Sequence, residues 1–476
     1  MHAAPFWLSN TTQLLCGRQP NNRMLLLPIG AVLLAHGAPP PGMDDLWAGA
    51  ARFTPIASFP VGAPGFASVN AGTRVVVSPG ADHTWYLFGR ADSGPTPRCP
   101  GGEISINVRA SADRGRSWGA PSALAAPDAA ARTCQYADGS AYFDAAGSGT
   151  WHYLVQVNTI GVGWELAHFY RSGDASPLGA WTPDPANPVV KGGQLFGQIC
   201  AGPGKHCPVG TVDEGTPQIV EKVGGDYYVT FHGYDYAKRA AVRGVARTTD
   251  FVSWNTTGAG LPGDAIFAAA DCEGWNVTWA AGGCIGSGEA SILRDPRSGY
   301  MYEVIEAADG GLTCDTSWGG QWWPLGLVRS RTWAPSPRWE QMPRALTPFV
   351  GGPAGGEPRV GCSVQYNSLH ADPGNNGTYL AFWDVSFHPA NGSDPFSTWH
   401  LYELVWGKPV LPMPWPGPPQ QGVDCSTADR CRASCPGFVE CAADGWFYCC
   451  AAPSQCAREH ACAGTPGLLG CACGAG

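Results

Sequence analysis

Three carboxylic acids and one arginine in this chain each precede an aromatic stretch by a similar distance, 12 to 15 residues. They are Asp138 in QYADGSAYFD, Glu214 in TVDEGTPQIVEK, Glu289 in IGSGEASILRD and Arg74 in AGTRVVVS. Hydrolysis of a glycosidic bond needs one carboxyl group that protonates the leaving oxygen and a second that acts as base or nucleophile. If a repeated fold brings equivalent positions together, the pattern predicts one cavity that holds Arg74 and all three acids. The permanently charged arginine would keep at least one acid ionised.

The segments around these residues resemble one another and predict a repeated β-structure. The turn SADRGRSW at 111–118 has looser counterparts that end at Trp181, Trp254 and Trp339. Aromatic strands are expected at 85–89, 151–156, 226–231, 300–307, 378–383 and 399–406. Short strands and polar turns that recur at a long period indicate small sheets around a channel. We therefore expect an all-β fold, a five-bladed β-propeller over residues 45–406. The strand before Ala67 or the one at 399–406 would close its ring.

The composition suits such a fold and argues against some partners. The chain has 65 glycines, 43 prolines and 20 tryptophans, and only 14% of its residues are charged. Most of the tryptophans would pack in the core, and some could stack on sugar rings. A net charge of −9 without a lysine or arginine cluster gives no indication of nucleic-acid binding. His152, His232 and His370 lack metal-ligand spacing, so no metal or other cofactor is expected.

Residues 1–37 are interpreted as a leader segment. Arg18 and Arg23 precede the apolar run MLLLPIGAVLLAHGA at 24–38, which is shorter than the roughly 20 apolar residues of a membrane span. Either Met1 or Met24 could be the start, and no later stretch is long enough to span a bilayer. We expect a secreted protein without a transmembrane span. Sequons for N-glycosylation at Asn255, Asn276, Asn376 and Asn391 fit that compartment.

The cysteines also favour secretion. Apart from Cys16, eight lie in the repeat region and ten lie between 425 and 473, so both blocks are even, as disulfide-bonded domains require. Proximity in the sequence predicts loop-closing pairs, and the remaining cysteines would link more distant segments. The expected pairs are Cys200–Cys207, Cys272–Cys284, Cys99–Cys134 and Cys314–Cys362.

A proline-rich segment and a cysteine-rich tail follow the repeats. GKPVLPMPWPGPPQQGVD at 407–424 contains six prolines and predicts a stiff, extended linker. Residues 425–476 have too few apolar side chains for a core of their own, so disulfides would replace it. A zinc module is the alternative, but an oxidising compartment favours disulfides. Such a tail could attach the protein to a polysaccharide or a surface.

Two blades resemble a known group of enzymes. QYADGSAYFD with WHYLVQ, and DEGTPQIVEKVGGDYYVTF, are similar to segments of the five-bladed arabinanase, β-xylosidase and invertase glycosidases. RTTDFVSW and YRSGDASPLGAW resemble blade edges of that group. The resemblance implies that Glu214 is the general acid and that Asp138 stabilises the transition state or modulates the proton. That group takes its base from an aspartate in blade one, where this sequence has AGTR.

Blade one instead resembles the sialidases. TRVVVSPGADHTWYLFGRADSG followed by ISINVRASADRGRSWGAP is similar to their arginine-bearing first strand, Arg-x-Asp loop and Asp box. The resemblance implies that Arg74 binds a substrate carboxylate, that Asp92 is a candidate acid and that Glu289 stands where the sialidase base does. Sialidases have six blades and a further arginine, whereas this sequence predicts five blades and has EVIEAADGG at the place of that arginine.

Several functions therefore remain open. The leading prediction is a secreted glycoside hydrolase that uses Glu214, Glu289 and Asp138, with a sialidase-like exoglycosidase as one alternative. A lectin-like propeller that binds glycans without cleaving them is a second alternative, favoured by the missing blade-one acid. A structural cell-wall protein is a third and would have no acids in a cleft. Each of the first three predicts a carbohydrate as the partner.

Overall fold

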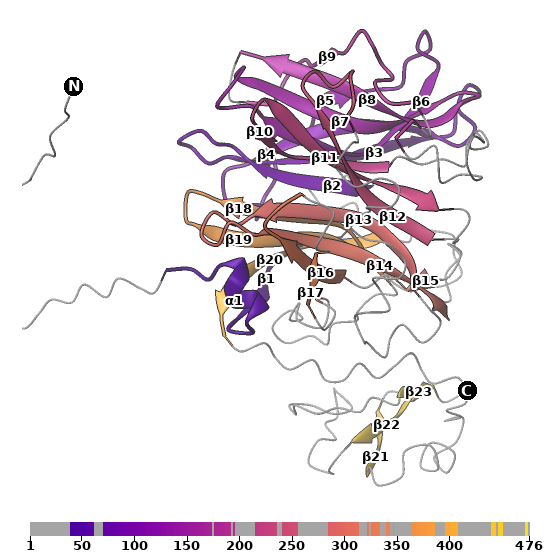
Figure 1. Ribbon diagram of the computed structural model, residues 1–476. Coiled ribbons are helices and arrows are strands. Elements are labelled where there is room, and N and C mark those ends of the chain that lie inside the picture. The colour runs from indigo at the N-terminus through magenta and orange to yellow at the C-terminus, as the bar shows by residue number, and fades with distance from the viewer. Residues whose placement is uncertain are drawn as a thin grey trace, which may run out of the picture. The chain divides into compact units, whose positions relative to one another are not determined.

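Figure 1 shows the computed structural model, which is built almost entirely of β-strands. The single helix among the described residues is α1 (Met43–Trp47), and no helix there is long and apolar enough to cross a membrane. The predicted leader, and the predicted linker beyond Gly407, lie outside the described residues. The structure describes residues 39–60, 70–173, 176–191, 194–195, 215–235, 240–255, 284–313, 321–322, 325–333, 339–342, 346, 363–385, 396–407, 439–443, 446–450 and 472–474.

One eight-stranded sheet contains two antiparallel groups of strands. The groups are joined by a single parallel pairing, of Ile104 with Gln135. The first group is β2 (Asn70–Val77), β3 (Trp85–Gly94), β4 (Glu103–Ser111) and β5 (Ser122–Ala125), and the second is β6 (Thr133–Phe143), β7 (Thr150–Thr159), β8 (Gly163–Ser172) and β9 (Thr182–Pro183).

A second eight-stranded sheet is divided in the same way. Its two groups meet at the parallel pairing of Ala241 with Gly286. The third group is β10 (Gly215–Val223), β11 (Asp226–Asp235) and β12 (Ala240–Thr248), and the fourth is β13 (Cys284–Arg294), β14 (Met301–Thr313), β15 (Gln321–Trp322), β16 (Leu325–Ser330) and β17 (Glu340–Gln341).

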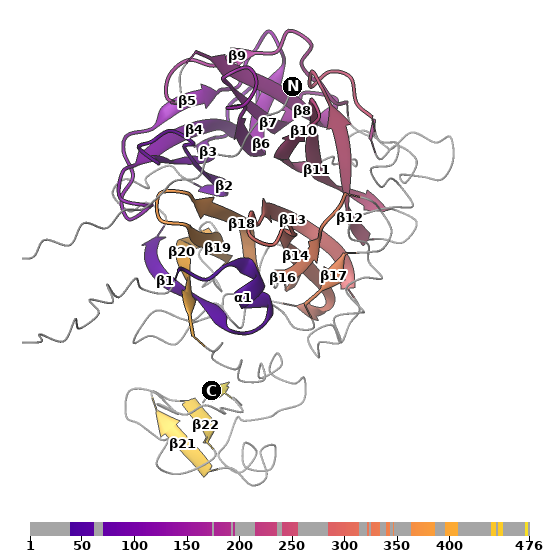
Figure 2. The same ribbon diagram turned by 60° about the vertical axis from the view of Figure 1, so that its left-hand side comes forward.

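The last group joins the two ends of the repeat region. Its strands are β18 (Ser363–Asp372), β19 (Gly377–Val385), β20 (Phe396–Trp406) and β1 (Ala51–Pro60). β1 pairs with β20 in antiparallel fashion, from Ala51 opposite Trp406 to Pro60 opposite Thr398 (Figure 2). A strand from before Ala67 thus lies beside the strand that contains residues 399–406.

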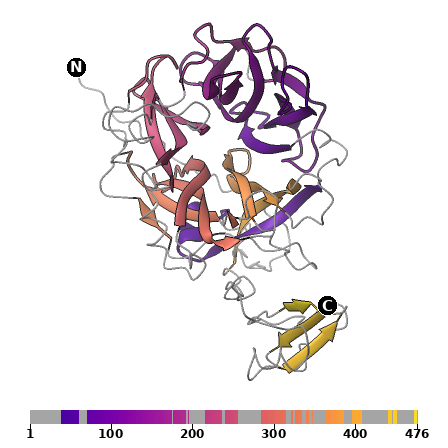
Figure 3. The same cartoon turned by 90° about the vertical axis from the view of Figure 1, so that its right-hand side faces the viewer.

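The first strands of the groups, here called the inner strands, form a closed circle. β2, β6, β10, β13 and β18 contact one another in that order, and β18 in turn contacts β2 (Figure 3). At four junctions a side chain of one inner strand accepts a hydrogen bond from a backbone N–H of the next. Ser140 bonds Ile219 (2.8 Å), Gln218 bonds Ile292 (2.7 Å), Ser291 bonds Leu369 (2.8 Å) and Ser368 bonds Val75 (2.9 Å).

We call Ser140, Gln218, Ser291 and Ser368, with the equivalent Arg74 of β2, the junction positions. Each inner strand carries a β-bulge two residues before its junction position. The register with the second strand shifts there in all five groups. A bulge leaves one residue out of the ladder and re-aims its side chain, and such irregularities often accompany functional sites. Positive φ angles of 40° to 64° mark four of these residues. We call the set the bulge positions; they are Gly72, Asp138, Thr216, Glu289 and Tyr366.

The polar turns before the repeated tryptophans share one hydrogen-bond pattern. In the turn 111–118, the Ser111 hydroxyl accepts from the N–H of Gly115 (2.8 Å) and the Asp113 carboxylate accepts from that of Ser117 (2.8 Å). In the turn 248–254, Thr248 accepts from Phe251 N–H (2.8 Å) and Asp250 accepts from Ser253 N–H (2.7 Å). Side chains that bond backbone two to four residues ahead stabilise such turns without a ladder.

Aromatic packing fills the space between neighbouring groups. Trp118 lies edge-on to Trp399 of the last group, with 6.0 Å between ring centroids. Trp85, Trp383 and Trp399 are fully buried in the same apolar cluster. Most of the tryptophans described here therefore stabilise the fold. Near the C-terminus, β21 (Val439–Ala443), β22 (Trp446–Cys450) and β23 (Ala472–Gly474) form a separate antiparallel sheet.

Candidate functional site

Two of the predicted acids occupy bulge positions, but the predicted place of Arg74 is wrong by two residues. Gly72, not Arg74, is equivalent to Asp138 and Glu289, because Arg74 stands at the junction position that Ser140 holds in β6. The turns between inner and second strands differ in length, seven residues after β2 and two after β10. The number of residues between an inner-strand residue and the next aromatic strand therefore does not identify equivalent positions.

Arg74 nevertheless binds one of the predicted acids. Its Nη2 lies 2.7 Å from Oε1 of Glu289, and both side chains are buried. The same guanidinium donates to the backbone oxygens of Ala290 (2.7 Å) and Asn367 (3.3 Å). Arg74 thus links β2 to β13 and β18.

Asp138 pairs with a different arginine, Arg90 on β3, which the sequence analysis missed. The guanidinium of Arg90 also lies over the ring of Tyr366, with 5.2 Å to the centroid. Burial alone would lower the pKa of Arg90, but the charge of Asp138 raises it above its usual range. A Cβ atom at Gly72 would clash with the Asp138 carboxylate and would lie 2.8 Å from Nε of Arg90. The ion pair therefore fills the space that an acid at position 72 would need.

Arg90 belongs to a second set of equivalent residues, which we call the opposing positions. Each lies on the second strand of its group, opposite the bulge. Four of them reach the bulge region of the next group along the circle. Arg90 pairs with Asp138, Gln156 accepts from Thr216 N–H (3.1 Å), Glu306 accepts from Tyr366 N–H, and Trp383 donates to the Thr73 hydroxyl (2.9 Å). The set is Arg90, Gln156, His232, Glu306 and Trp383.

Burial sets the protonation of Glu289. It raises the pKa of this carboxyl to about 7, while Arg74 acts in the opposite direction and Asp138 in the same one. Burial likewise raises the pKa of Glu306 well above its usual range, and the neighbouring Glu289 adds to that effect. A carboxyl group with a pKa near 7 can hold a proton and release it at neutral pH, which is what general acid–base catalysis requires.

Several buried polar atoms at this place have no hydrogen-bond partner among the described residues. Such atoms cost free energy, and a cluster of them in a folded protein calls for an explanation. Donors and acceptors are both represented, from six different strands, and the Tyr153 hydroxyl lies directly against Gly139. The atoms are Oδ1 of Asp138, Oε2 of Glu289, the hydroxyl oxygen of Tyr153, Oδ1 of Asn367, and Nε of Arg74 and of Arg90.

A buried ion pair borders the site on the side of β12 and β14. Nε of Arg243 lies 3.9 Å from Oε1 of Glu303, and Nη1 donates to the hydroxyl of Thr216 (2.7 Å). Burial lowers the pKa of Arg243 to about 10 and raises that of Glu303 to about 7. Arg243 therefore connects the pair to the bulge position of β10.

The remaining predicted residues lie elsewhere or outside the described residues. Asp92 is exposed on β3, two residues beyond Arg90. Cys99 and Cys134 form a disulfide with 5.5 Å between their Cα atoms. Only the backbone of Cys284 is described. Glu214, two residues before Thr216, and Cys200, Cys207, Cys272, Cys314 and Cys362 lie outside the described residues.

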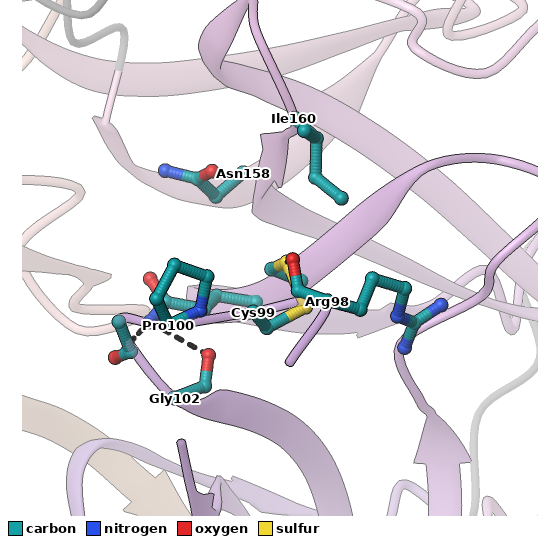
Figure 4. Close-up of a pocket in the computed structure, with 9 residues that line it drawn as sticks. Arg98, Cys99, Pro100, Gly102, Asn158 and Ile160 are labelled. Atoms are coloured by element: carbon teal, nitrogen blue, oxygen red, sulfur yellow. Dashed lines mark hydrogen bonds between the residues drawn. A yellow bond between two sulfur atoms is a disulfide. The ribbon is translucent and has the colours of Figure 1, made fainter. Parts of the chain in front are cut away.

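The disulfide borders a pocket of about 240 Å³ (Figure 4). Arg98, Pro100, Gly102, Asn158 and Ile160 are among its lining residues, none of them acidic. It contains neither Asp138 nor Glu289, so the bulge positions remain the candidate site. In the described part of the chain, no three His, Cys, Asp or Glu side chains lie close enough together to hold a metal ion.

A second buried polar region, here called the histidine network, lies between the second and third groups. The Tyr227 hydroxyl contacts Nε2 of His152 (3.2 Å), Nδ1 of His152 contacts Nε2 of His168 (3.1 Å), and Nδ1 of His168 contacts Asp184 (3.0 Å). Phe251 stacks on both imidazoles. Burial lowers the pKa of His152 to about 4 and also lowers that of His168, so both rings are neutral near pH 7.

Comparisons with known proteins found solved structures of glycoside hydrolases at low identity. No protein-family model matches the sequence, and no curated protein matches it. An endo-arabinase from Bacteroides thetaiotaomicron is 12% identical, with 72% of this chain and 95% of that chain covered and a TM-score of 0.41. An α-L-arabinofuranosidase from Lactobacillus brevis is 11% identical (71% and 91% covered, TM-score 0.45). The catalytic domain of a Coprinopsis cinerea GH62 α-L-arabinofuranosidase is 13% identical (75% and 98% covered, TM-score 0.44). Similarity at this level assigns no role to any residue.

Proposed function

We propose that the chain is a secreted five-bladed β-propeller that hydrolyses a glycosidic bond at its bulge positions. The five strand groups would be the blades, closed by the pairing of β1 with β20. One observation carries the proposal. Glu289 and Asp138 stand at equivalent positions, each bound to an arginine through one oxygen, and each has a second, buried oxygen without a partner among the described residues.

Glu289 would be the proton donor. Its Oε1 faces Arg74, so the proton of the neutral carboxyl belongs on Oε2, the oxygen that has no partner in the described residues. Because burial raises the pKa of Glu289 to about 7, a proton is available there at neutral pH. Protonation of the glycosidic oxygen would let the leaving group depart, and the vacated carboxylate would remain beside Arg74.

Asp138 would supply the second carboxyl group. Its ion pair with Arg90 compensates the charge of the carboxylate, and its Oδ1, which has no partner in the described part of the chain, would activate water or stabilise the positive charge that develops on the sugar ring. The Tyr153 hydroxyl is next to this acid along the strand pair and would donate to it or to the substrate. Glu214 remains a third candidate acid, two residues before the bulge position of β10.

A binding protein without catalysis is the second candidate. Gly72 stands where a third acid of the circle would be, and the Asp138–Arg90 pair occupies the space beside it. A polar cavity of this kind could hold a glycan without cleaving it. A sialidase-like enzyme has less support, because Arg74 already binds Glu289 and two backbone oxygens and would have to release them to bind a substrate carboxylate.

Hydrolysis of a panel of aryl glycosides, including a sialoside, tests the proposal. Wild type should cleave at least one member, and Glu289→Gln should lower kcat about 10²–10⁴-fold because the amide cannot donate a proton. Glu214→Gln on the same substrate shows whether that acid contributes. Full activity of Glu289→Gln would remove Glu289 from the mechanism. Glycan binding without turnover by wild type would establish the lectin-like function instead.

Secretion is supported by two kinds of residue. Cys99 and Cys134 form a buried disulfide, a bond that persists mainly in oxidising compartments. The sequon asparagines Asn255 and Asn376 are both exposed. Expression in a secretory host followed by removal of N-glycans should shift the electrophoretic mobility of the protein, and no shift would count against glycosylation at these sites.

A further inference from the structure

We propose that Glu306 is the positioning residue that holds both carboxyl groups of the site in place. This inference rests on the proposed function. Glu306 lies at the opposing position of β14 and is buried. Its Oε2 accepts the backbone N–H of Glu289 at 3.0 Å, and its Oε1 accepts the backbone N–H of Tyr366. One side chain thus binds the bulge residues of two adjacent inner strands.

The bulges explain why such a residue is needed. A bulge removes its residue from the hydrogen-bond ladder, so the N–H of that residue needs another acceptor. At Thr216 the acceptor is Gln156, the residue equivalent to Glu306 in the second group. A neutral amide has one oxygen and suffices for one N–H, whereas Glu306 serves two. A carboxylate supplies an acceptor oxygen to each, which a glutamine at position 306 could not do.

The contacts of Glu306 extend to the other acid of the site. Tyr366, whose N–H it accepts, has a φ of 54°, a backbone conformation that non-glycine residues rarely adopt. The Tyr366 ring lies against Arg90, and Arg90 pairs with Asp138. Glu306 therefore positions Glu289 directly through its backbone and Asp138 indirectly through Tyr366 and Arg90.

Glu306 and Glu289 also interact electrostatically. Burial and the neighbouring Glu289 both raise the pKa of Glu306 well above its usual range. The charged groups that act on Glu289 itself are Arg74, Arg90 and Arg243, which favour its ionised form, and Asp138, which opposes it. A change at position 306 that displaces the Glu289 backbone also displaces its carboxyl group relative to Arg74 and Asp138, so the Glu289 titration should change.

Two variants separate the effect of the side-chain length of Glu306 from the effect of its acidic group. Glu306→Gln keeps the length but offers only one acceptor and no charge. Glu306→Asp keeps the charge but is one methylene too short to serve both N–H groups. Glu165→Gln is the matched control, because Glu165 is a buried glutamate on β8 that accepts from the Thr159 hydroxyl (2.8 Å).

The experiment combines kinetics with an NMR titration of glutamate carboxyl carbons, with the Glu289 signal assigned by Glu289→Gln. Glu306→Gln should change the pKa of Glu289, move the alkaline limb of the kcat profile with it and lower kcat by about 10²-fold, as a misplaced catalytic group does. Glu306→Asp should lower kcat similarly with a smaller change in the Glu289 titration, and Glu165→Gln should match wild type. Wild-type Glu289 titration and kcat in both Glu306 variants would overturn the inference. If wild type cleaves no substrate, the proposed function fails, and the NMR titration still decides the role of Glu306.

Discussion

The bulge positions and the histidine network are both buried polar regions, and they differ in how their hydrogen bonds are completed. With both imidazoles neutral, each ring nitrogen of the network has a partner. Nδ1 of His168 donates to Asp184, and Nδ1 of His152 donates to Nε2 of His168. Nε2 of His152 lies 3.2 Å from the Tyr227 hydroxyl, which also lies 3.1 Å from the Asp144 carboxylate. At the bulge positions, by contrast, carboxylate, guanidinium and phenol atoms remain without partners among the described residues.

This difference indicates which of the two regions is the functional site. A polar network whose members all bond one another stabilises a unique packing and has no capacity left for a ligand. A cluster with unpartnered donors and acceptors, positive φ angles and raised carboxyl pKa values is destabilised in the absence of a ligand. Such a cost is typical of functional sites, so the bulge positions rather than the histidine network are the candidate site.

Matched aspartate-to-asparagine changes in the two regions should give the largest difference in the free energy of unfolding. Asp138→Asn leaves the charge of Arg90 without compensation in a largely buried place, which should lower the free energy of unfolding by about 3 kcal/mol. Urea denaturation at pH 7 measures this loss. If Asp138→Asn proved no less stable than wild type, the ion pair with Arg90 would not be what holds this acid.

The two regions should also respond to pH in opposite directions. Glu289 has a folded pKa of about 7, above its unfolded value near 4.5, so the folded state binds more protons between these values. Its contribution to stability is present below pH 4.5 and is lost as the pH rises through 7. His152 has a folded pKa of about 4, below its unfolded value near 6.5, so its contribution is present above pH 6.5 and is lost as the pH falls through 4.

Urea midpoints at pH 5, 6 and 7 test these signs. Relative to wild type, Glu289→Gln should weaken the loss of stability from pH 5 to 7, and His152→Gln should weaken the loss from pH 7 to 5. Curves that run parallel to wild type in both variants would show that neither group titrates as its surroundings predict.

The smallest effect is expected from Asp184→Asn in the histidine network. The amide oxygen still accepts from Nδ1 of His168, so only the charge-assisted part of that hydrogen bond is lost, about 1 kcal/mol. Turnover on the wild-type substrate should not change. A loss as large as that of Asp138→Asn would mean that Asp184 compensates a protonated histidine, contrary to the neutral network.

The strands, and the equivalence of Asp138 and Glu289, could be predicted from the sequence because both leave local signals. Aromatic strands alternate with turns of recognisable chemistry, and Asp138 and Glu289 lie in similar small-residue settings. The all-β character of the described chain agrees with that prediction. Arg74 pairs with one of the acids that the sequence grouped with it, although its expected register was wrong, because its long side chain reaches Glu289 on β13.

The opposing positions could not be found in the same way. Arg90, Gln156, Glu306 and Trp383 share a place in the fold, but they differ in chemistry and serve different atoms of the next group. A search for similar residues at similar spacing cannot detect such a set. Their common feature is the bulge that each one faces, and bulges depend on pairing between strands rather than on local sequence. The motif WYLFGRAD, with an arginine directly after an aromatic strand, was the one available signal for Arg90.

The pairing of β1 with β20 has a consequence for synthesis of the protein on the ribosome. The hydrogen bond between Ser58 and His400 joins residues 342 positions apart, so β1 has no partner strand until nearly the whole repeat region has been translated. At about 5–20 residues per second, β1 would wait roughly 20–70 s with an unpaired edge. Nascent chains of this protein should therefore depend on chaperones during that interval, and their final fold is completed only after β20 emerges.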